Sequence, residues 1–191
     1  MVVNASSEEG YLCVNGMSEH ARMAENSNSA LVVTVTPDDF EGGSALSGVE
    51  FQRKYEKAAY DLCRGKGPVQ LARDFVKARV SDRFDGVSPS FTGETEFVDL
   101  RECLPGFISD SLKEGLMVFE KKLKGFTNGG AVLTGVEMRT SAPLRIKRDE
   151  NCESISHKGL FPCGEGAGYA GGIMSAAVDG IRVANKILEM G

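Results

Sequence analysis

One stretch near the C-terminus decides the fold: LFPCGEGAGYAGGIMSAAVDGIRVANKILE, from Leu160 to Glu189. Six of the 23 glycines in the chain fall between Gly159 and Gly172. A very short apolar run precedes these glycines, and a long segment with helical spacing of its apolar residues follows them. The pattern predicts a strand, a glycine-rich loop and a final helix that ends near Glu189.

The predicted final helix has one apolar face and one polar face. Half of the residues on the apolar face are Ala or Gly, so the helix can lie close to whatever it packs against. The apolar face comprises Ile173, Ala176, Ala177, Gly180, Val183, Ala184, Ile187 and Leu188, and the residues expected to face away are Ser175, Asp179, Arg182, Lys186 and Glu189.

The glycine loop before this helix has the chemistry of a site for an anionic or electron-rich oxygen. A helix N-terminus presents unpaired backbone N–H groups and a partial positive charge, and glycines let a ligand approach the backbone closely. A phosphate, or the carbonyl edge of a flavin, would suit such a site. The alternative interpretation is structural: a tight turn that lets the helix pack closely on a sheet.

Residues Gly166–Gly171 match the pattern GxGxxG, but their context differs from that of the dinucleotide-binding fingerprint. That fingerprint opens a βαβ unit, and an acid that binds a ribose follows about 20 residues later. Only one helix fits after Gly171 in this sequence. The loop is therefore not the first turn of a complete Rossmann domain, and the lack of the pattern GxxxxGKS/T excludes a P-loop.

The composition is that of a globular protein with a hydrophobic core, since 41% of the 191 residues are hydrophobic and 26% are charged. The net charge of −5 argues against a nucleic acid as partner, because phosphate neutralisation supplies most of that affinity. No apolar run approaches the roughly 20 residues that span a bilayer, and the N-terminus lacks the pattern of a signal peptide. These features predict a cytoplasmic protein without a membrane partner.

The five cysteines form no CxxC pair and have only two histidines beside them. This pattern predicts reduced, mostly buried thiols and no metal site. Cys163 lies just before the glycine loop, so a redox role beside a flavin stays open against a purely structural role at the end of a strand.

The remainder of the chain alternates the patterns of strands and helices. Turn and stop signals separate these elements, and two capping boxes mark helix starts. The predicted elements are an apolar segment at Tyr11–Val14 closed by an Asn15-Gly16 turn, a buried strand over Ala30–Thr36, a helix start at Pro37, a helix capped by Ser47–Glu50 and ended by Gly65, a helix over 69–78, a loop over 81–96, a helix capped by Ser111–Glu114 and ended by Gly125, and strands over 131–138 and 144–147.

Four stretches of the sequence resemble FAD-dependent dehydrogenases, which are often called NAD(FAD)-utilizing dehydrogenases. They are Val3–Gly10, Asn26–Leu31, Leu133–Pro143 and Lys158–Gly180, so the resemblance extends over nearly the whole chain. It implies a fold of mixed α+β and α/β character. Residues 1–128 would form a substrate-side domain, and residues 129–191 the closing strand–loop–helix segment of a Rossmann-like FAD-binding domain.

The resemblance also implies which residues would bind FAD. Glu165 would hydrogen-bond the ribityl or pyrophosphate region, and the amides near Gly171, Gly172 and Ile173 would face the pyrimidine end of the isoalloxazine. The whole set comprises Gly164, Glu165, Gly166, Ala167, Gly168, Gly171, Gly172 and Ile173, together with Arg139, Thr140 and Ser141.

The chain departs from the family in lacking the N-terminal FAD-binding half, which carries the true GxGxxG and its ribose-binding acid. We therefore expect the C-terminal part of a flavin-dependent oxidoreductase that acts on a small molecule, with NAD(P)H as a possible electron donor. No catalytic residue is assigned. On its own the chain is expected to bind FAD weakly or not at all, to be inactive, and to self-associate through exposed apolar surface. The alternative is a non-catalytic interaction or dinucleotide-binding module.

Overall fold

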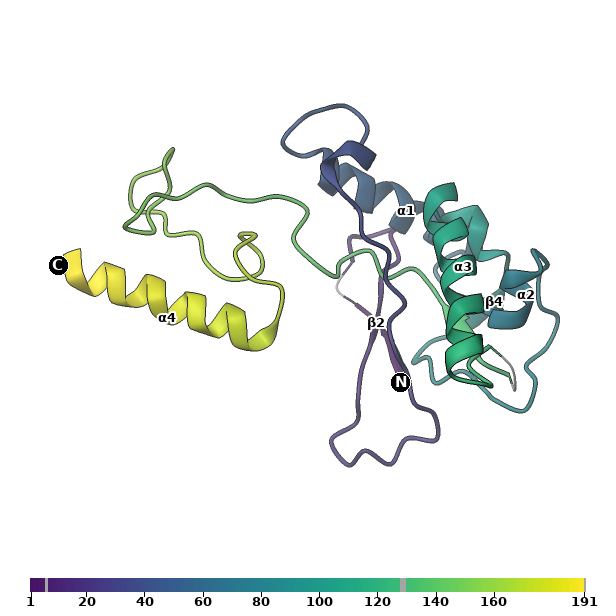
Figure 1. Cartoon of the computed structure of the whole chain (residues 1–191). Coiled ribbons are helices and arrows are strands. Elements are labelled where there is room, and N and C mark those ends of the chain that lie inside the picture. The colour runs from purple at the N-terminus through teal and green to yellow at the C-terminus, as the bar shows by residue number, and fades with distance from the viewer. Residues whose placement is uncertain (6, 128–129, 191) are drawn as a thin grey trace. The chain divides into compact units, whose positions relative to one another are not determined.

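The structure of the chain, a computed structural model, describes residues 1–5, 7–127 and 130–190 (Figure 1). Two compact units are present: unit 1 comprises Met1–Asp39 and Gln52–Met138, and unit 2 comprises Phe40–Phe51 and Arg139–Gly191. Small sheets combine with helices, so the fold is α+β, as predicted. The predicted domain boundary between 128 and 129 lies outside the described residues and stays a prediction.

A three-stranded sheet lies at the centre of unit 1. Its middle strand, β3 (Gly67–Leu71), pairs in parallel with β4 (Thr95–Phe97) and antiparallel with β5 (Val132–Thr134). All five residues of β3 are buried, which suits a strand covered on both faces. The helix predicted over 69–78 is therefore wrong in its first part, because residues up to Leu71 belong to β3 and only α2 (Ala72–Val76) is helical.

The hydrophobic core of unit 1 collects buried side chains from three α-helices and one 3-10 helix, and partly buried Leu133 of β5 packs against it. Ala59 of α1 (Ser47–Cys63), Cys103 of η2 (Leu100–Cys103) and Phe75 of α2 are buried in it. Helices α2 and α3 (Gly106–Lys122) contact each other, and both are labelled beside β4 in Figure 1. Gly67 sits where a Cβ atom would lie 2.7 Å from the Phe91 ring, so a larger residue there would displace that ring. The core members are Leu12, Ala59, Cys63, Ala72, Phe75, Val98, Leu100, Cys103, Leu116 and Val136.

The long helices end close to where the sequence predicts, and α1 and α4 also begin there, whereas α3 begins earlier. At the start of α1, the Ser44 hydroxyl accepts from the Leu46 amide at 3.1 Å, and the Ser47 hydroxyl accepts from the Ser44 amide at 2.9 Å. These contacts add a hydrogen-bonded turn directly before the helix, which begins at Ser47. Helix α3 begins after Pro105 rather than at Ser111, because proline with its fixed φ suits a helix start.

The N-terminal segment forms a two-stranded antiparallel sheet from β1 (Val2–Asn4) and β2 (Val14–Gly16). The turn between these strands lies at Glu8–Tyr11, where the Tyr11 amide donates to the Glu8 carbonyl at 3.0 Å. The turn predicted at Asn15-Gly16 is therefore wrong, because both residues pair within β2. The helix start predicted at Pro37 is confirmed as the short 3-10 helix η1 (Pro37–Asp39), where the Thr36 amide donates to the Asp39 carboxylate at 2.7 Å.

Residues Ala30–Thr36 are extended but belong to no strand of the described structure. Leu31 packs partly against the core, whereas Val32 is 68% exposed. The prediction of a buried strand is wrong in this respect: the residue types favour an extended backbone, but a strand also needs a neighbour with which to pair.

Unit 2 contains the predicted final helix, α4 (Ile173–Met190), but no regular strand among its described residues. The strands predicted at 144–147 and before the glycine loop are wrong. The Pro162 carbonyl accepts a hydrogen bond from the Arg148 guanidinium at 2.8 Å, so a side chain pairs with this backbone where a strand neighbour would have done so. In the described part of the chain, no helix is both long and apolar enough to cross a membrane.

Candidate functional site

The glycine loop closes on itself immediately before α4. The Gly168 amide donates to the Glu165 carbonyl at 2.9 Å, and the Tyr169 amide donates to the Gly164 carbonyl at 3.0 Å. The first bond of the helix runs from the Ala176 amide to the Gly172 carbonyl at 2.9 Å. The local geometry therefore turns the chain sharply and presents the start of an 18-residue helix.

The glycines of the loop have two different roles. Gly164 and Gly168 have positive φ values of 70° and 82°, which favour glycine. A Cβ atom on Gly168 would also lie 2.4 Å from the Leu144 carbonyl oxygen. In contrast, a Cβ atom on Gly166 or Gly171 would meet nothing within 4 Å. These two open glycines leave the backbone accessible to a ligand.

The backbone amides at the start of α4 have no hydrogen-bond partner in the described part of the chain. Within the described ranges, the N–H groups of Gly171, Gly172 and Ile173 make no hydrogen bond, and the Ile173 side chain is 89% exposed. Unpaired amides at a helix N-terminus carry a partial positive charge. The open backbone at Gly171 and these donors together fit a phosphate or a flavin carbonyl edge.

A nearly buried ion pair holds the loop against α4. The Arg148 guanidinium binds the Asp179 carboxylate through contacts of 2.6 and 2.9 Å, and the side chains are only 6% and 11% exposed. The Asp179 carboxylate also accepts from the Gly164 amide at 2.9 Å. The Arg148 guanidinium lies 3.7 Å from the ring centroid of Tyr169, and the Tyr169 hydroxyl donates to the Ile146 carbonyl at 3.0 Å.

Sequence reasoning missed this cluster and placed Asp179 on the face of α4 that points away. That prediction is wrong, because Asp179 lies on the inner face with Gly180 and buried Val183. The hydrogen bonds from Arg148 lower the pKa of the Asp179 carboxyl to about 2, and the Gly164 amide adds to the effect against the opposing effect of burial. The sequence offered one signal for this position: Asp179 is a single acidic residue beside small residues on one face of the helix.

The structure places the predicted site residues in two groups. Residues 164–173 form the loop and helix start, where Glu165 is exposed and the Ala167 carbonyl accepts from the Ile146 amide at 3.2 Å. Arg139, Thr140 and Ser141 are exposed and lie upstream of the segment that packs beside the loop. Thr140 and Ser141 make no hydrogen bond to the loop within the described ranges, so their role at a flavin stays a prediction.

A shallow cavity of about 400 Å³ lies elsewhere, in unit 1, and contains none of the predicted site residues. It is lined by Leu62, Cys63, Arg64, Lys66 and Glu96. Burial raises the pKa of the Cys63 thiol to about 11, so the thiol is protonated at neutral pH and is a poor nucleophile. This cavity offers no catalytic arrangement.

The cysteines are all unpaired, as predicted. Cys13, Cys63, Cys103 and Cys152 are buried, and Cys163 is exposed beside the loop. Burial raises the pKa of the Cys103 thiol to about 12. No group of three or more His, Cys, Asp or Glu side chains that could hold a metal ion occurs in the part of the chain that the structure describes.

Comparisons with known proteins identify the class to which this α+β chain belongs. Residues 1–140 match the family described as FAD-dependent protein, C-terminal domain-like, and the chain belongs to this family. A Clostridium beijerinckii protein described as uncharacterized is 57% identical over 191 residues, which cover 99% of this chain and 36% of the relative. The chain thus spans about a third of the length of the relative that it matches.

Proposed function

We propose that the chain is part of a flavin-dependent oxidoreductase, and that the glycine loop and the start of α4 face the flavin. The observation that carries this proposal is the open backbone at Gly171, which directly precedes unpaired amides at a helix N-terminus. Membership of an FAD-dependent family, by a match over residues 1–140, supports the flavin dependence, and the loop lies outside the matched residues. Bound FAD would supply the electron or hydride transfer, while the protein supplies orientation and electrostatics.

Each residue group of the loop has a distinct part in this proposal. The amides of Gly171, Gly172 and Ile173 would donate to an isoalloxazine oxygen, which gains negative charge on reduction. Gly166 would allow close approach of the cofactor, and the exposed Glu165 carboxylate would accept from ribityl hydroxyls. Gly164 and Gly168 would keep the loop in its shape through their positive φ values.

A spectrum of the longer protein tests the flavin proposal. We expect the purified C. beijerinckii relative to show absorption bands near about 370 and 450 nm, as a bound flavin does. A separate titration of the 191-residue chain should give no FAD complex at low micromolar concentration. A colourless relative that also fails to bind added FAD would contradict the proposal, and tight FAD binding by the chain alone would contradict the expectation of an incomplete site.

We further propose NAD(P)H as the electron donor and a small molecule as the substrate. Anaerobic addition of NADH or NADPH to the flavin-loaded relative would bleach the band near about 450 nm if the donor is right. Retention of this band with both nucleotides, followed by its loss with dithionite, would show a functional flavin with a different donor.

A second candidate function is interaction without catalysis, and the outer face of α4 favours it. Ile173, Met174, Ile181 and Leu188 on this face are 89%, 75%, 63% and 78% exposed. Such a stripe is large for a surface in contact with water alone. When the chain is on its own, we expect it to self-associate through this face. Light scattering should show concentration-dependent oligomers, which Ile181→Glu removes and Glu189→Gln does not.

A further inference from the structure

We propose that residues Ala30–Val35 are an edge that receives a β-strand from the part of the longer protein that lies outside this chain. This inference does not depend on flavin binding. The main evidence is that the backbone of this segment is unpaired. Within the described ranges, no N–H or C=O group from Ala30 to Val35 makes a hydrogen bond. An unpaired extended backbone is a template for strand addition.

The segment has the composition of a strand that is covered on both faces. Its sequence, ALVVTV, is rich in β-branched residues, and apolar side chains occur on both alternating faces. Leu31 packs partly against the core of unit 1, which accounts for the inner face. On the outer face, Val32 is 68% exposed, so this apolar surface has no cover in the described structure.

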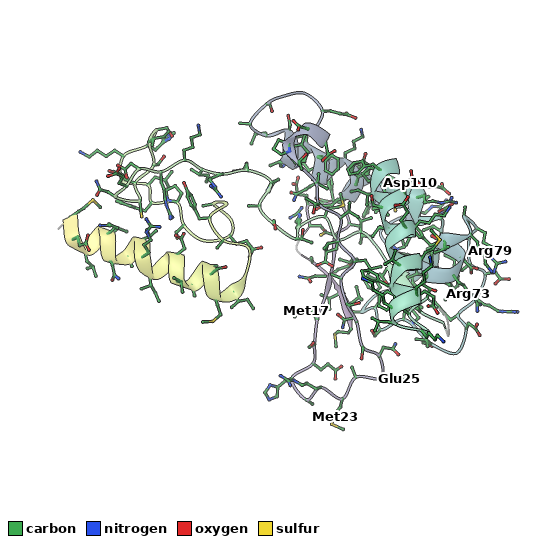
Figure 2. The ribbon with its side chains drawn as sticks, in the orientation of Figure 1. Met17, Met23, Glu25, Arg73, Arg79 and Asp110 are labelled. Atoms are coloured by element: carbon green, nitrogen blue, oxygen red, sulfur yellow. The ribbon has the colours of Figure 1, made fainter. Side chains whose placement is uncertain are left out.

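Hydrogen bonds before the segment tie it to other parts of unit 1, and a local bond follows it. Before it, the Asn28 side chain donates to the Met17 carbonyl at 3.0 Å, and the Asn26 side chain donates to the Ser88 carbonyl at 2.6 Å. After it, the Thr36 amide donates to the Asp39 carboxylate at 2.7 Å. Figure 2 shows the loop between Met17 and Asn28 that these contacts close, with Met23 and Glu25 labelled on it. An edge anchored at its N-terminal side loses less entropy than a free segment when a strand pairs with it.

The length of the relative indicates where the strand that pairs with this edge would come from. It contains this region at 57% identity, yet the region makes up only 36% of its length. Most of that protein therefore lies outside the matched region and is covalently linked to it, which gives a strand from the remainder a high effective concentration at the edge. A second copy of the chain is the competing occupant.

Amide hydrogen exchange compares the edge in the two proteins. We expect the amides of 30–35 to exchange about 100-fold more slowly in the full-length C. beijerinckii relative, at the aligned positions, than in the 191-residue chain. Amides of β3 serve as the internal reference, since they are paired within this chain and need no partner from outside it. Equally fast exchange of the edge in both proteins would overturn the proposal. Protection in the 191-residue chain that grows with its concentration would also overturn it, in favour of a second copy.

A pair of proline variants provides a matched test. Val32→Pro and Val33→Pro remove N–H groups that point to opposite edges of an extended segment. In the 191-residue chain neither N–H is bonded, so we expect both variants to keep its Tm within about 2 °C. In the relative, the variant on the paired edge should lower the Tm by about 5 °C or more. Unchanged Tm values for both aligned variants in the relative would overturn the proposal, and the exchange experiment on the wild-type proteins decides if a variant does not fold.

Discussion

Arg148 and Asp179 show how single residues outside the loop determine its geometry. Their ion pair lies under the loop, and the same carboxylate accepts from the Gly164 amide. The face of Tyr169 covers the guanidinium. Because these side chains are largely withdrawn from water, their interactions are weakened little by solvent, in contrast to the exposed Lys186–Glu189 pair on the same helix.

Removal of the charge on Asp179 should destabilise unit 2. We expect Asp179→Asn to lower its free energy of unfolding by about 2 kcal/mol, because Arg148 would lose its charged partner. The measurement is urea unfolding, read through hydrogen exchange of the α4 amides. The matched control is Glu189→Gln, which alters an exposed pair and should leave these amides unchanged. An equal effect of the two variants would contradict the role assigned to Asp179.

The same carboxylate predicts an acid-sensitive contribution to stability. Its pKa of about 2 in the folded protein is below the ordinary value of 3.8, so its contribution is complete above about pH 4 and is lost as the pH falls towards 2. We expect the difference in stability between wild type and Asp179→Asn to shrink by about 1 kcal/mol between pH 5 and 2.5, after allowance for solvent screening. A difference that stays constant over this range, in urea unfolding curves, would exclude a titrating Asp179.

At the scale of elements, the junction of β3 and α2 depends on a buried hydroxyl. Ser81 Oγ accepts from the Leu71 amide at 2.9 Å and donates to the Asp74 carboxylate at 2.7 Å. Burial opposes ionisation of Asp74, but hydrogen bonds from Ser81 and Arg79 hold its pKa below the usual range. Figure 2 labels Arg79 and Arg73 beside α2. The Ser81 hydroxyl thus pairs with a backbone amide at the end of β3 and with a carboxylate in the first turn of α2.

Loss of that hydroxyl should cost more than loss of an exposed one. Ser81→Ala leaves the Leu71 amide without its partner, and we expect the free energy of unfolding to fall by about 2 kcal/mol. Ser88→Ala, at an exposed serine of the following loop, should change it by less than about 0.5 kcal/mol. Chemical unfolding followed by circular dichroism measures both values, and similar values would contradict the assigned junction.

Local patterns in the sequence predict the long helices but not how elements pair. The apolar stripes and glycine stops of α1 and α3, and the existence of α4, depend on neighbours three or four residues away, so they can be predicted from local sequence. Residues 69–71 of β3 are predicted from local sequence as the start of a helix, because the burial of this strand comes from partners on both sides. The partner of Asp179 lies 31 residues away, which no local pattern reveals.

At the scale of the whole molecule, the chain is an α+β domain whose relative is about three times as long. Two surfaces of the chain are apolar and uncovered, the outer face of α4 and the edge at Ala30–Val35. Both are explained if further polypeptide packs on them in the longer protein. The glycine loop itself could be predicted from sequence, whereas its support by unit 2 side chains could not.

The FAD affinity of the longer protein with a blocked loop tests the central claim most directly. Gly171 has open space and no positive φ, so the substitution aligned with Gly171→Val adds bulk at the proposed flavin face without backbone strain. Gly180→Ala, in α4 and also in open space, is the matched control. We predict that Gly171→Val raises the Kd for FAD at least about 10-fold while its Tm without FAD and the Kd of the control stay unchanged. Equal FAD affinities for wild type and both variants would contradict the claim that this loop faces the flavin.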